Sequence, residues 1–407
     1  MGEILFLSHR IPFPPDRGDK IRSHHVLKEL ARLAPVHVAT FVDDDSDLAA
    51  EAELAAISRS YRLARRTKPL LVAGLEALAR RLPVSLTAFH DSSLADYVAQ
   101  LLATRPVTTI YVFSGQMAQY VPQDFAGRVI VDFVDVDSAK FDAYAAAKGL
   151  FGWIDAREGR LLRGEEARAA ARSDVSLLIS GAEAGLFVER LPEQLRGTVD
   201  VRVLGNGIDS GFFDPAAVAA EPRLLACPGP RLIFTGQMDY APNVAAALRV
   251  IDGILPIVRR RLPEATFHVV GRNPARELLG RDGRDGCHVW GRVPDMRPWL
   301  KAADLALVPL EIARGVQNKV LEAMAMALPV VLTEGAATGI DAARGTDFLV
   351  ADNDAELAAA AIDRLSDRAA AHAMGEAARR WIVDKAGWAA ALSPLSALVA
   401  PPAAHAA

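Results

Sequence analysis

The sequence predicts an α/β fold of two Rossmann-like, doubly wound domains, each a parallel sheet with helices on both faces. Short apolar runs recur along the chain, and each is followed by a segment of helical periodicity, which is typical of βαβ units. The runs fall into two series separated by a turn-rich stretch, which indicates two such domains. The predicted strands are Ile4–Leu7, Val36–Val42, Thr109–Phe113, Val129–Val134, Val175–Ile179, Arg231–Phe234, Thr266–Val270, His288–Trp290, Leu305–Val308 and Pro329–Leu332.

A stretch rich in glycine and proline separates the two series of strands. The chain has 407 residues, which is long enough for two full cores. Because turn formers cluster between Gly205 and Pro230, we place the linker there. We expect an N-terminal domain over 1–204 and a C-terminal domain over 205–376. The last helical pattern, 377–398, is a candidate to pack back on the N-terminal domain.

Composition and charge exclude several classes of function. The chain is 51% hydrophobic with a net charge of -4, so no overall basic field favours nucleic acid as a partner. Cys227 and Cys287 are too few for a disulfide framework and are expected to be free thiols. The N-terminus lacks a signal peptide pattern, and no uncharged apolar stretch is long enough to span a bilayer. We therefore expect a cytoplasmic protein, and peripheral contact with the inner face of a membrane stays open.

The segment from Asp304 to Val331 carries the clearest chemical pattern and is expected to form a strand, loop, helix and strand. The helix is expected to begin near Asn318, a good capping residue, and a helix N-terminus suits a diphosphate. Lys319 is expected in the first turn, where a cation is unfavourable beside the positive end of the helix dipole. An anion bound in front of the helix would explain a lysine at this position. Glu322 lies one turn further and could hold both hydroxyls of a ribose. A solvated Lys–Glu pair is the alternative, but the position after a strand end favours a ligand.

The run Glu322-Ala-Met-Ala-Met-Ala-Leu-Pro-Val-Val resembles the donor-binding element of GT-B glycosyltransferases, in the large retaining group called family 4. The resemblance implies two Rossmann-like domains facing a cleft, with Glu322 on the ribose of the donor. Family members carry an earlier glutamate that touches a sugar hydroxyl, and Arg314 stands in its place here. Arginine cannot accept hydrogen bonds, so Arg314 is expected either to contact an acidic or differently substituted sugar or to bind the diphosphate.

Three further runs are similar to the same family. Val203-Leu-Gly-Asn-Gly-Ile-Asp is similar to its interdomain segment, Phe234-Thr-Gly to its first donor loop, and Gly291-Arg-Val to a loop facing the base. The family's usual cation in the first donor loop is absent, and Arg272, Lys319 or Arg314 could replace it, although Arg272 could equally be a surface turn residue. The donor-binding residues that the resemblance implies are Gly18, Gly236, Arg292, Val293, Gly315, Val316, Gln317, Asn318 and Glu322.

The loop after the first strand is expected to serve the acceptor. Arg17, Asp19 and Lys20 cluster before a helix, and Gly18 allows close backbone approach. In the family, a glycine-containing loop at this place faces the donor phosphates and the acceptor. The whole run from Ser8 to His25 is similar to exopolysaccharide-associated sugar transferases that occur beside exosortase (PEP-CTERM) systems in bacteria.

Three carboxylates, Asp132, Asp135 and Asp137, lie at the end of the strand at Val129–Val134 and directly after it. Alternating acids can bind a divalent metal, but the resemblance implies that no metal or other cofactor is needed. Many relatives place a histidine near here that touches the donor sugar. Since this sequence has Val134 and Asp135 there, Asp135 is the candidate polar group facing the sugar.

These patterns and the resemblance together predict a glycosyltransferase that uses a nucleoside-diphosphate sugar as co-substrate and a glycan or lipid-linked acceptor. The resemblance implies that it retains the anomeric configuration and serves bacterial exopolysaccharide biosynthesis. The expected catalytic residues are Arg272, Arg314 and Lys319, which would stabilise the leaving diphosphate, together with Asp135. One alternative is a nucleotide-sugar epimerase on the same fold, and another is a non-catalytic sugar-nucleotide-binding partner of a polysaccharide assembly complex. A dehydrogenase is disfavoured because no Gly-x-Gly-x-x-Gly follows the first strand.

Overall fold

The computed structural model describes residues 2–15, 17–148, 152–311 and 316–400. The chain divides into two compact units, which we call the first and second domains. The first domain comprises residues 1–206 together with 391–407, and the second comprises 207–390. The division after Asn206 lies two residues beyond the predicted boundary. Each domain is described by itself.

The first domain is built on a sheet of seven parallel strands in the order β3-β2-β1-β4-β5-β6-β7. Its inner strands are continuously buried, as expected for a sheet covered on both faces. The strands are β1 (Glu3–Ser8), β2 (Val36–Val42), β3 (Ser60–Arg65), β4 (Val107–Phe113), β5 (Arg128–Val134), β6 (Val175–Leu178) and β7 (Val201–Val203).

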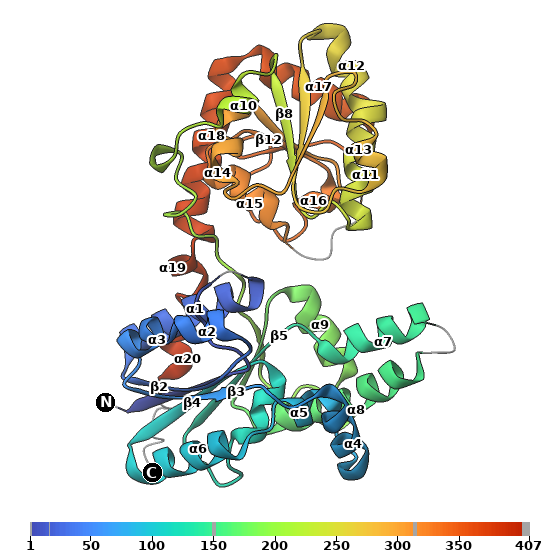
Figure 1. Cartoon of the computed structure of the whole chain (residues 1–407). Coiled ribbons are helices and arrows are strands. Elements are labelled where there is room, and N and C mark those ends of the chain that lie inside the picture. The colour runs from blue at the N-terminus through green and yellow to red at the C-terminus, as the bar shows by residue number, and fades with distance from the viewer. Residues whose placement is uncertain (1, 16, 149–151, 312–315, 401–407) are drawn as a thin grey trace. The chain divides into compact units, whose positions relative to one another are not determined.

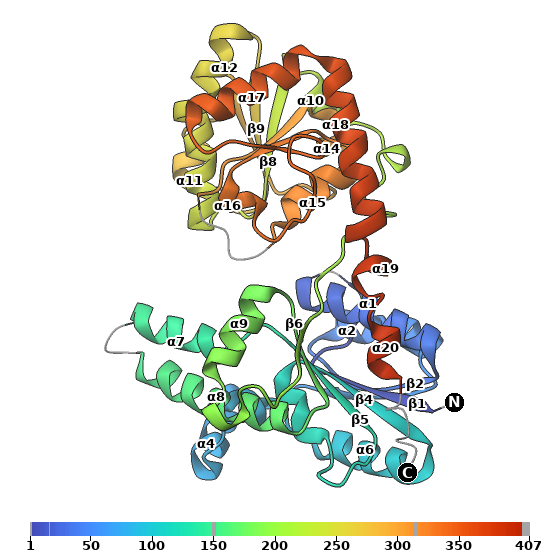
Figure 2. The same cartoon turned by 180° about the vertical axis from the view of Figure 1, so that it is seen from behind.

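Helices cover both faces of this sheet, with α1 and α20 on one face and α6 on the other (Figures 1 and 2). The elements are α1 (Gly18–Leu33), α2 (Asp45–Ala49), α3 (Glu51–Ile57), α4 (Leu70–Arg80), α5 (Val84–Ala88), α6 (Ser92–Thr104), η1 (Gly115–Tyr120), α7 (Asp137–Lys148), α8 (Trp153–Ala171), α9 (Gly181–Arg190), η3 (Glu193–Leu195) and α20 (Leu395–Val399).

The second domain has a sheet of six parallel strands in the order β10-β9-β8-β11-β12-β13. Chain order runs outward from β8 in both directions, so β8 and β11 flank the point where the winding reverses. The strands are β8 (Arg231–Thr235), β9 (Thr266–Val270), β10 (Cys287–Gly291), β11 (Leu305–Val308), β12 (Val330–Leu332) and β13 (Leu349–Val350).

Helices again lie on both faces, with α11 and α12 on one side and α14, α15 and α18 on the other (Figures 1 and 2). The elements are η4 (Pro215–Ala217), α10 (Pro222–Leu225), α11 (Ala241–Arg249), η5 (Val250–Ile254), α12 (Leu255–Arg261), α13 (Arg276–Leu279), α14 (Arg297–Ala302), α15 (Asn318–Ala325), α16 (Glu334–Ala337), α17 (Asp354–Ser366), α18 (Arg368–Trp381), η6 (Ile382–Ala386) and α19 (Trp388–Ala391).

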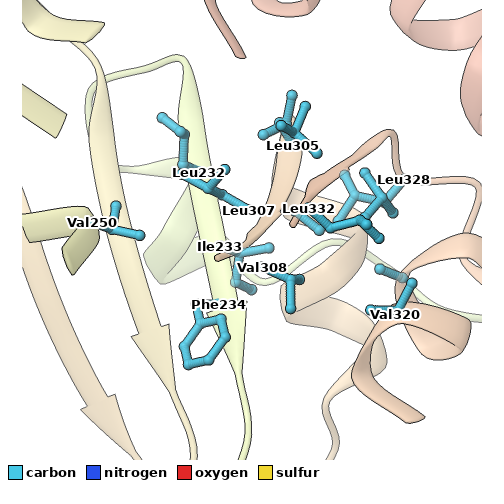
Figure 3. Close-up of a cluster of buried hydrophobic side chains, with 14 of the residues drawn as sticks. Leu232, Ile233, Phe234, Val250, Leu305, Leu307, Val308, Val320, Leu328 and Leu332 are labelled. Atoms are coloured by element: carbon cyan, nitrogen blue, oxygen red, sulfur yellow. The ribbon is translucent and has the colours of Figure 1, made fainter. Parts of the chain in front are cut away.

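The core of the second domain fixes α15 against the sheet. Figure 3 shows side chains of β8 and β11 packed together, with Val320 of α15 beside them. Val320 and Met324 are one turn apart, and both are fully buried. Leu321 and Ala325 continue the buried face, so the start of α15 is held rigidly at the edge of the sheet. The core therefore sets the position of Lys319 and Glu322, the ionisable residues of this helix.

Three strands escaped the sequence prediction, namely β3, β7 and β13. Each of β3 and β7 carries arginine within a short run, and β13 has only two residues. All three are edge strands, where one side faces solvent or a loop and a continuous apolar run is not required. Apolar runs therefore predict all of the inner strands but, of the four edge strands, only β10.

The C-terminal helix predicted over 377–398 is wrong as a single element. Helix α18 ends at Trp381, a π-turn follows, and Gly387 is extended with φ of -65° and ψ of 156°. Here the chain pairs with the linker, because the backbone N–H of Ile208 donates to the carbonyl of Ala386 at 2.8 Å. Only the last part, α20, lies on the first domain, where Thr109 donates to the carbonyl of Val399.

One continuous helical stretch in the described residues, Ala241–Arg261, is long and apolar enough to cross a membrane by length and composition alone. It contains Arg249 and Asp252, so it escaped the search for uncharged runs. One side of it, including Val250 and Ile254, is buried in the core of the second domain, and 44% of the apolar window is buried. The stretch therefore packs with one side against the core of the domain.

Candidate functional site

The candidate site lies at the carboxyl ends of β8, β9, β10 and β11 in the second domain. In open parallel sheets, ligands bind outside these ends, at the point where the strand order reverses. The loops that follow β8, β9 and β10 are joined here by backbone hydrogen bonds. The backbone N–H of Gly271 donates to the carbonyl of Gly291 at 2.9 Å, and that of Met238 donates to the carbonyl of Arg272 at 2.8 Å. These three loops therefore form one rim, which we call the rim of the site.

Gly236 and Gly271 allow this rim to close. Gly236 has a φ of +150°, and a Cβ there would stand 3.0 Å from Nδ2 of Asn243 and 3.3 Å from Cε of Lys319. A Cβ on Gly271 would collide with the carbonyl of Gly236 at 1.7 Å. Glycine is therefore required at both positions for sterics, and Gly236 brings backbone within reach of the Lys319 side chain.

Lys319 is the central cation of the site. Its Nζ donates to Oδ1 of Asn243 at 2.6 Å and lies 5.0 Å from the centre of the Phe234 ring. No carboxylate among the described residues lies within ion-pair distance of it. Burial lowers the pKa of Lys319 to about 8, although the negative charge of Glu322 opposes this shift. A partly desolvated cation with no ion-pair partner favours binding of an anion.

The sequence analysis did not predict a role for Asn243. It noted only that the family's usual cation is absent from the first donor loop. It is buried in the first turn of α11, where its Nδ2 donates to the carbonyl of Gln237 at 2.9 Å. This bond orients its Oδ1 toward Lys319. The sequence shows Asn243 only as a polar residue that follows Pro242 at a helix start. Its partner Lys319 is 76 residues away, so the contact could not be predicted.

Glu322 lies one turn after Lys319 and is partly buried. Burial raises the pKa of this carboxyl, and the positive charge of Lys319 opposes the rise. Its oxygens accept no hydrogen bond from any residue in the described ranges. A partly buried carboxylate without donors is costly unless a ligand supplies them. Hydroxyl groups of a ligand would satisfy it.

The loop before α15 is described only in part. Arg314 and Gly315, two of the predicted site residues, lie outside the described residues. Gln317 precedes the helix, and Asn318 is exposed as its first residue. The prediction that Asn318 caps the helix is therefore wrong, because the cap position belongs to Gln317, whose side chain does not cap. Val316 lies beside Gly339, where an added Cβ would stand 2.9 Å from its Cγ2.

Arg272, Arg292 and Val293 lie on the same rim. Arg272 is exposed, and its Nη2 donates to Oε1 of Gln237 at 2.8 Å, next to Gly236. Arg292 is exposed directly after β10, whereas Val293 packs against the domain core. The structure therefore brings Gly236, Arg272 and Lys319 to one edge, with Arg292 on the adjoining loop.

The acceptor-side residues predicted in the first domain are largely occupied by partners within the domain. Asp19 accepts from Arg10 at 2.6 Å and from His9 at 3.2 Å. Burial would raise the pKa of Asp19, but these hydrogen bonds outweigh it and hold the pKa well below its usual range. Arg17 is more exposed, 3.9 Å from Asp47, and the exposed Gly18 opens α1.

Lys20 corrects the prediction most clearly. Its side chain is buried, and its ammonium pairs with the buried Asp47 and donates to the carbonyl of Phe13 at 3.3 Å. The side chain therefore lies within the domain, not on the surface that was expected to hold an acceptor. The sequence could not show this, because Asp47 is 27 residues away and belongs to another helix.

The three predicted carboxylates at and after the end of β5 lie in two different environments. Asp132 is fully buried, receives two hydrogen bonds from Arg22 and accepts from the hydroxyl of Tyr111 at 2.8 Å. Asp135 and Asp137 are partly exposed and share Lys140, at 2.9 and 3.1 Å. Among the described residues, no group of three or more histidine, cysteine or acidic side chains could hold a metal ion.

Arg22 connects this buried pair to the end of the first domain. Besides Asp132, it donates to the carbonyl of Leu204 at 2.8 Å, the carbonyl of Gly205 at 3.1 Å and Oδ1 of Asn206 at 2.9 Å. These partners are more than 100 residues away in the sequence, so only the fold shows that Arg22 anchors the start of the linker.

A cavity of about 670 Å³ opens at the opposite end of the second sheet. It is lined by Arg231, Asp304 and Pro329, which stand at the amino ends of β8, β11 and β12. Helix N-termini after the strands point away from this end. The cavity is therefore separate from the rim around Lys319.

Comparison with known proteins finds a family model that matches most of the second domain. Residues 229–368 match the family model described as glycosyl transferases group 1. The match includes all of the second-domain residues discussed above, from Gly236 to Glu322. No curated protein matches the chain.

Solved structures similar to this chain extend over nearly all of it. HepE of Anabaena, in complex with UDP, is 14% identical, with a TM-score of 0.61 and coverage of 97% of this chain and 98% of that one. Sucrose-phosphate synthase from Thermosynechococcus elongatus is 16% identical, with a TM-score of 0.61 and 98% coverage of both. WaaG, a glycosyltransferase involved in lipopolysaccharide biosynthesis, is 16% identical, with a TM-score of 0.58 and coverage of 98% and 99%. These likenesses show that the fold is GT-B.

Proposed function

We propose that this protein is a glycosyltransferase that takes its sugar from a nucleoside-diphosphate sugar bound at the rim around Lys319 and Glu322. The observation that carries the proposal is the pair itself. A desolvated cation and a carboxylate that accepts no hydrogen bond from the described residues stand one turn apart at the start of α15. A diphosphate joined to a ribose offers the complementary groups, namely anionic oxygens and two vicinal hydroxyls.

The diphosphate is assigned to Lys319 and the free N–H groups of α15. Unpaired N–H groups and the positive end of the helix dipole favour an anion at this place. Asn243 holds the ammonium of Lys319 near Gly236, so the phosphate can approach the backbone closely. Arg272, on the neighbouring loop, is exposed and can swing from Gln237 to a phosphate oxygen.

The ribose is assigned to Glu322, and the base to the loop of Arg292 and Val293. An ionised carboxylate can accept from both ribose hydroxyls at once. The raised pKa of Glu322 does not prevent this, because hydrogen bonds to the charged form favour ionisation. HepE, which shares the fold, has been crystallised with UDP and with UDP-glucose.

The chemistry that we propose is transfer with retention, of the family 4 type. As the bond from the sugar to the diphosphate breaks, negative charge develops on the leaving oxygen, and Lys319, Arg272 and the helix N–H groups stabilise it. Arg314 would add a further positive charge or contact the sugar. Asp135 is proposed as the polar group facing the sugar, and no metal or other cofactor takes part.

For the acceptor, we propose a glycan or a lipid-linked glycan of bacterial exopolysaccharide synthesis, in systems of the exosortase (PEP-CTERM) type. The support is the similarity of the Ser8–His25 run to such transferases. In that run, the side chain of Arg17 is exposed and accessible to an acceptor. Lys20 is buried and stabilises the first domain through its ion pair with Asp47.

A donor screen tests the proposal. Thermal unfolding is followed with UDP-, GDP-, ADP- and dTDP-sugars, because a ligand that binds only the native protein raises its stability. We expect one nucleotide to stabilise the wild type and Glu322→Ala to weaken its affinity about 10- to 100-fold, the value of one or two hydrogen bonds to a charged group. Glu264→Ala, at an exposed loop position, is the matched control. Unchanged affinity in Glu322→Ala would refute the donor site.

The alternatives are separated by product analysis with the bound nucleotide-sugar. An epimerase converts the sugar in the absence of any acceptor, whereas a transferase releases nucleoside diphosphate in proportion to the glycan formed. A non-catalytic binding partner does neither, although it binds the donor.

A further inference from the structure

Helix α4 of the first domain turns its apolar face outward. Leu71 is 83% exposed, Leu75 70% and Leu78 59%, and their spacing of four and three residues places them on one face. The opposite face carries Ala73 and Ala77, which are fully buried. A soluble surface helix shows the reverse arrangement, with large apolar residues inside. The leucine face is therefore not used by the fold of this domain.

The helix is held firmly in this orientation. The hydroxyl of Thr87 donates to the carbonyl of Ala73 at 2.8 Å, and Nη2 of Arg157 donates to the carbonyl of Ala77 at 3.0 Å. Lys68 pairs with Glu76 at 3.0 Å. Hydrogen bonds at the start, middle and end of the helix thus fix which side faces outward. The exposure is a property of the fold and not of a loose segment.

Helix α8 carries two further exposed apolar residues at its start, Trp153 at 65% and Ile154 at 55%. One turn later, Arg157 of α8 donates to the carbonyl of Ala77 in α4 at 3.0 Å, and Ala77 belongs to the buried face of that helix. The leucines lie on the other face of α4, so we keep the two groups separate. We call Leu71, Leu75 and Leu78 of α4 the apolar patch.

Basic residues flank α4 in the sequence. Between Arg59 and Arg81 the sequence has seven basic residues and a single acidic one, Glu76, in a protein whose net charge is -4. Arg65, Arg80 and Arg81 are exposed. Arg65 pairs with Asp45 at 2.8 Å and Arg80 with Glu76 at 3.3 Å, but exposed pairs of this kind are weak, so a lipid phosphate can replace the carboxylate. Apolar side chains bordered by arginine are typical of surfaces that lie on anionic lipid.

We propose that the apolar patch docks on a bilayer of anionic phospholipid, with α4 in the plane of the interface. Helix α4 has 11 residues, too few for the roughly 20 that span a bilayer. A second copy of this chain is disfavoured as the occupant, because a symmetric contact would bring two strongly basic segments together. The leucines would enter the acyl boundary while the arginines meet the headgroup phosphates. This inference is independent of the proposed donor site.

Vesicle flotation tests this surface directly. Wild-type protein should float with vesicles of equal phosphatidylglycerol and phosphatidylcholine, and far less with phosphatidylcholine alone. Leu71→Ser with Leu75→Ser should weaken partition at least about tenfold, because two leucines no longer leave water. Arg80→Gln with Arg81→Gln should weaken it about fivefold for each arginine removed, and raised salt should reduce that contribution.

A matched control and the oligomeric state complete the experiment. Leu225→Ser with Leu279→Ser changes two leucines of the second domain that are 47% and 51% exposed, and it should bind vesicles like the wild type. Circular dichroism checks that both double variants remain folded. The proposal is overturned if wild type does not float with the anionic vesicles, or if the α4 leucines make no difference. It is also overturned if light scattering shows a wild-type dimer that these leucine substitutions dissociate.

Discussion

The two domains place ionisable residues in the same structural position, but only the first domain pairs their charges with its own carboxylates. In both, charged side chains follow the carboxyl ends of parallel strands, around the start of a helix. In the first domain, Lys20 and Arg22 at the start of α1 are buried and paired with Asp47 and Asp132. In the second, Lys319 and Glu322 of α15 have no ion-pair partner among the described residues.

This difference separates a position stabilised by its own domain from one that we propose is completed by a ligand. Charges taken out of water are costly unless partners compensate them. The first domain provides those partners from its own chain. The second domain leaves the pKa of Lys319 lowered to about 8 and that of Glu322 raised, and in both cases burial is the main cause. Perturbed groups of this kind are typical of functional sites.

The largest effect is expected from breaking the buried pair of the first domain. Asp132→Ala leaves the guanidinium of Arg22 buried without its carboxylate, which should cost about 3–5 kcal/mol of stability. Hydrogen exchange measured by mass spectrometry should show faster exchange in β5 and unchanged protection in β8. Equal loss in both sheets, or no loss in either, would contradict a pair that stabilises the first domain alone.

The next effect concerns the open site of the second domain. Lys319→Met removes the cation and keeps the apolar stem, so affinity for the nucleoside diphosphate should fall about 10- to 100-fold, the value of a hydrogen bond to a charged group. Calorimetry with the nucleotide found in the donor screen measures this. Stability of the free protein should stay constant or rise, since a desolvated charge is removed. A large loss of stability would mean that Lys319 is structural, like Lys20.

A pH titration sharpens the same contrast. The lowered pKa of Lys319, about 8, means that the folded protein without ligand releases this proton more readily than the unfolded chain. Stability of the free protein should therefore rise between pH 8 and about 10.5, the ordinary lysine pKa. A bound diphosphate favours the charged form, so affinity should be full below pH 8 and fall about fivefold between pH 8 and 9.

Lys319→Arg provides the control for that titration. Arginine stays charged over this range, so the fall in affinity above pH 8 should disappear. If the fall persists in the arginine variant, another group titrates, and Lys319 is not the cation that meets the phosphate.

The smallest effect is expected at Asp135, which is partly exposed and pairs with Lys140. Asp135→Asn should change stability by less than about 1 kcal/mol, as is usual for exposed ion pairs. If Asp135 faces the sugar as proposed, kcat should fall while donor affinity is unchanged. Wild-type kcat in this variant would remove Asp135 from the catalytic residues.

Much of the fold could be predicted because its inner strands are buried on both faces. All ten predicted strands are present, several with the same bounds, such as Val36–Val42 and Thr266–Val270. The edge strands β3, β7 and β13 could not be predicted, since an edge does not need an apolar run. The final helix was also misjudged. Gly387 is extended and forms a β-bridge with Ile208, so the helix cannot continue through it.

The sequence by itself determined that the start of α15 carries a lysine and a glutamate one turn apart after a buried strand. These are local facts, because helical spacing follows from the backbone geometry. Only the tertiary structure decided which of the charges discussed here have an ion-pair partner among the described residues. Lys20 finds Asp47, and Arg22 finds Asp132 across 110 residues, whereas Lys319 meets the neutral Asn243. Whether a charge is neutralised depends on contacts between distant segments, and those exist only once the sheets have formed.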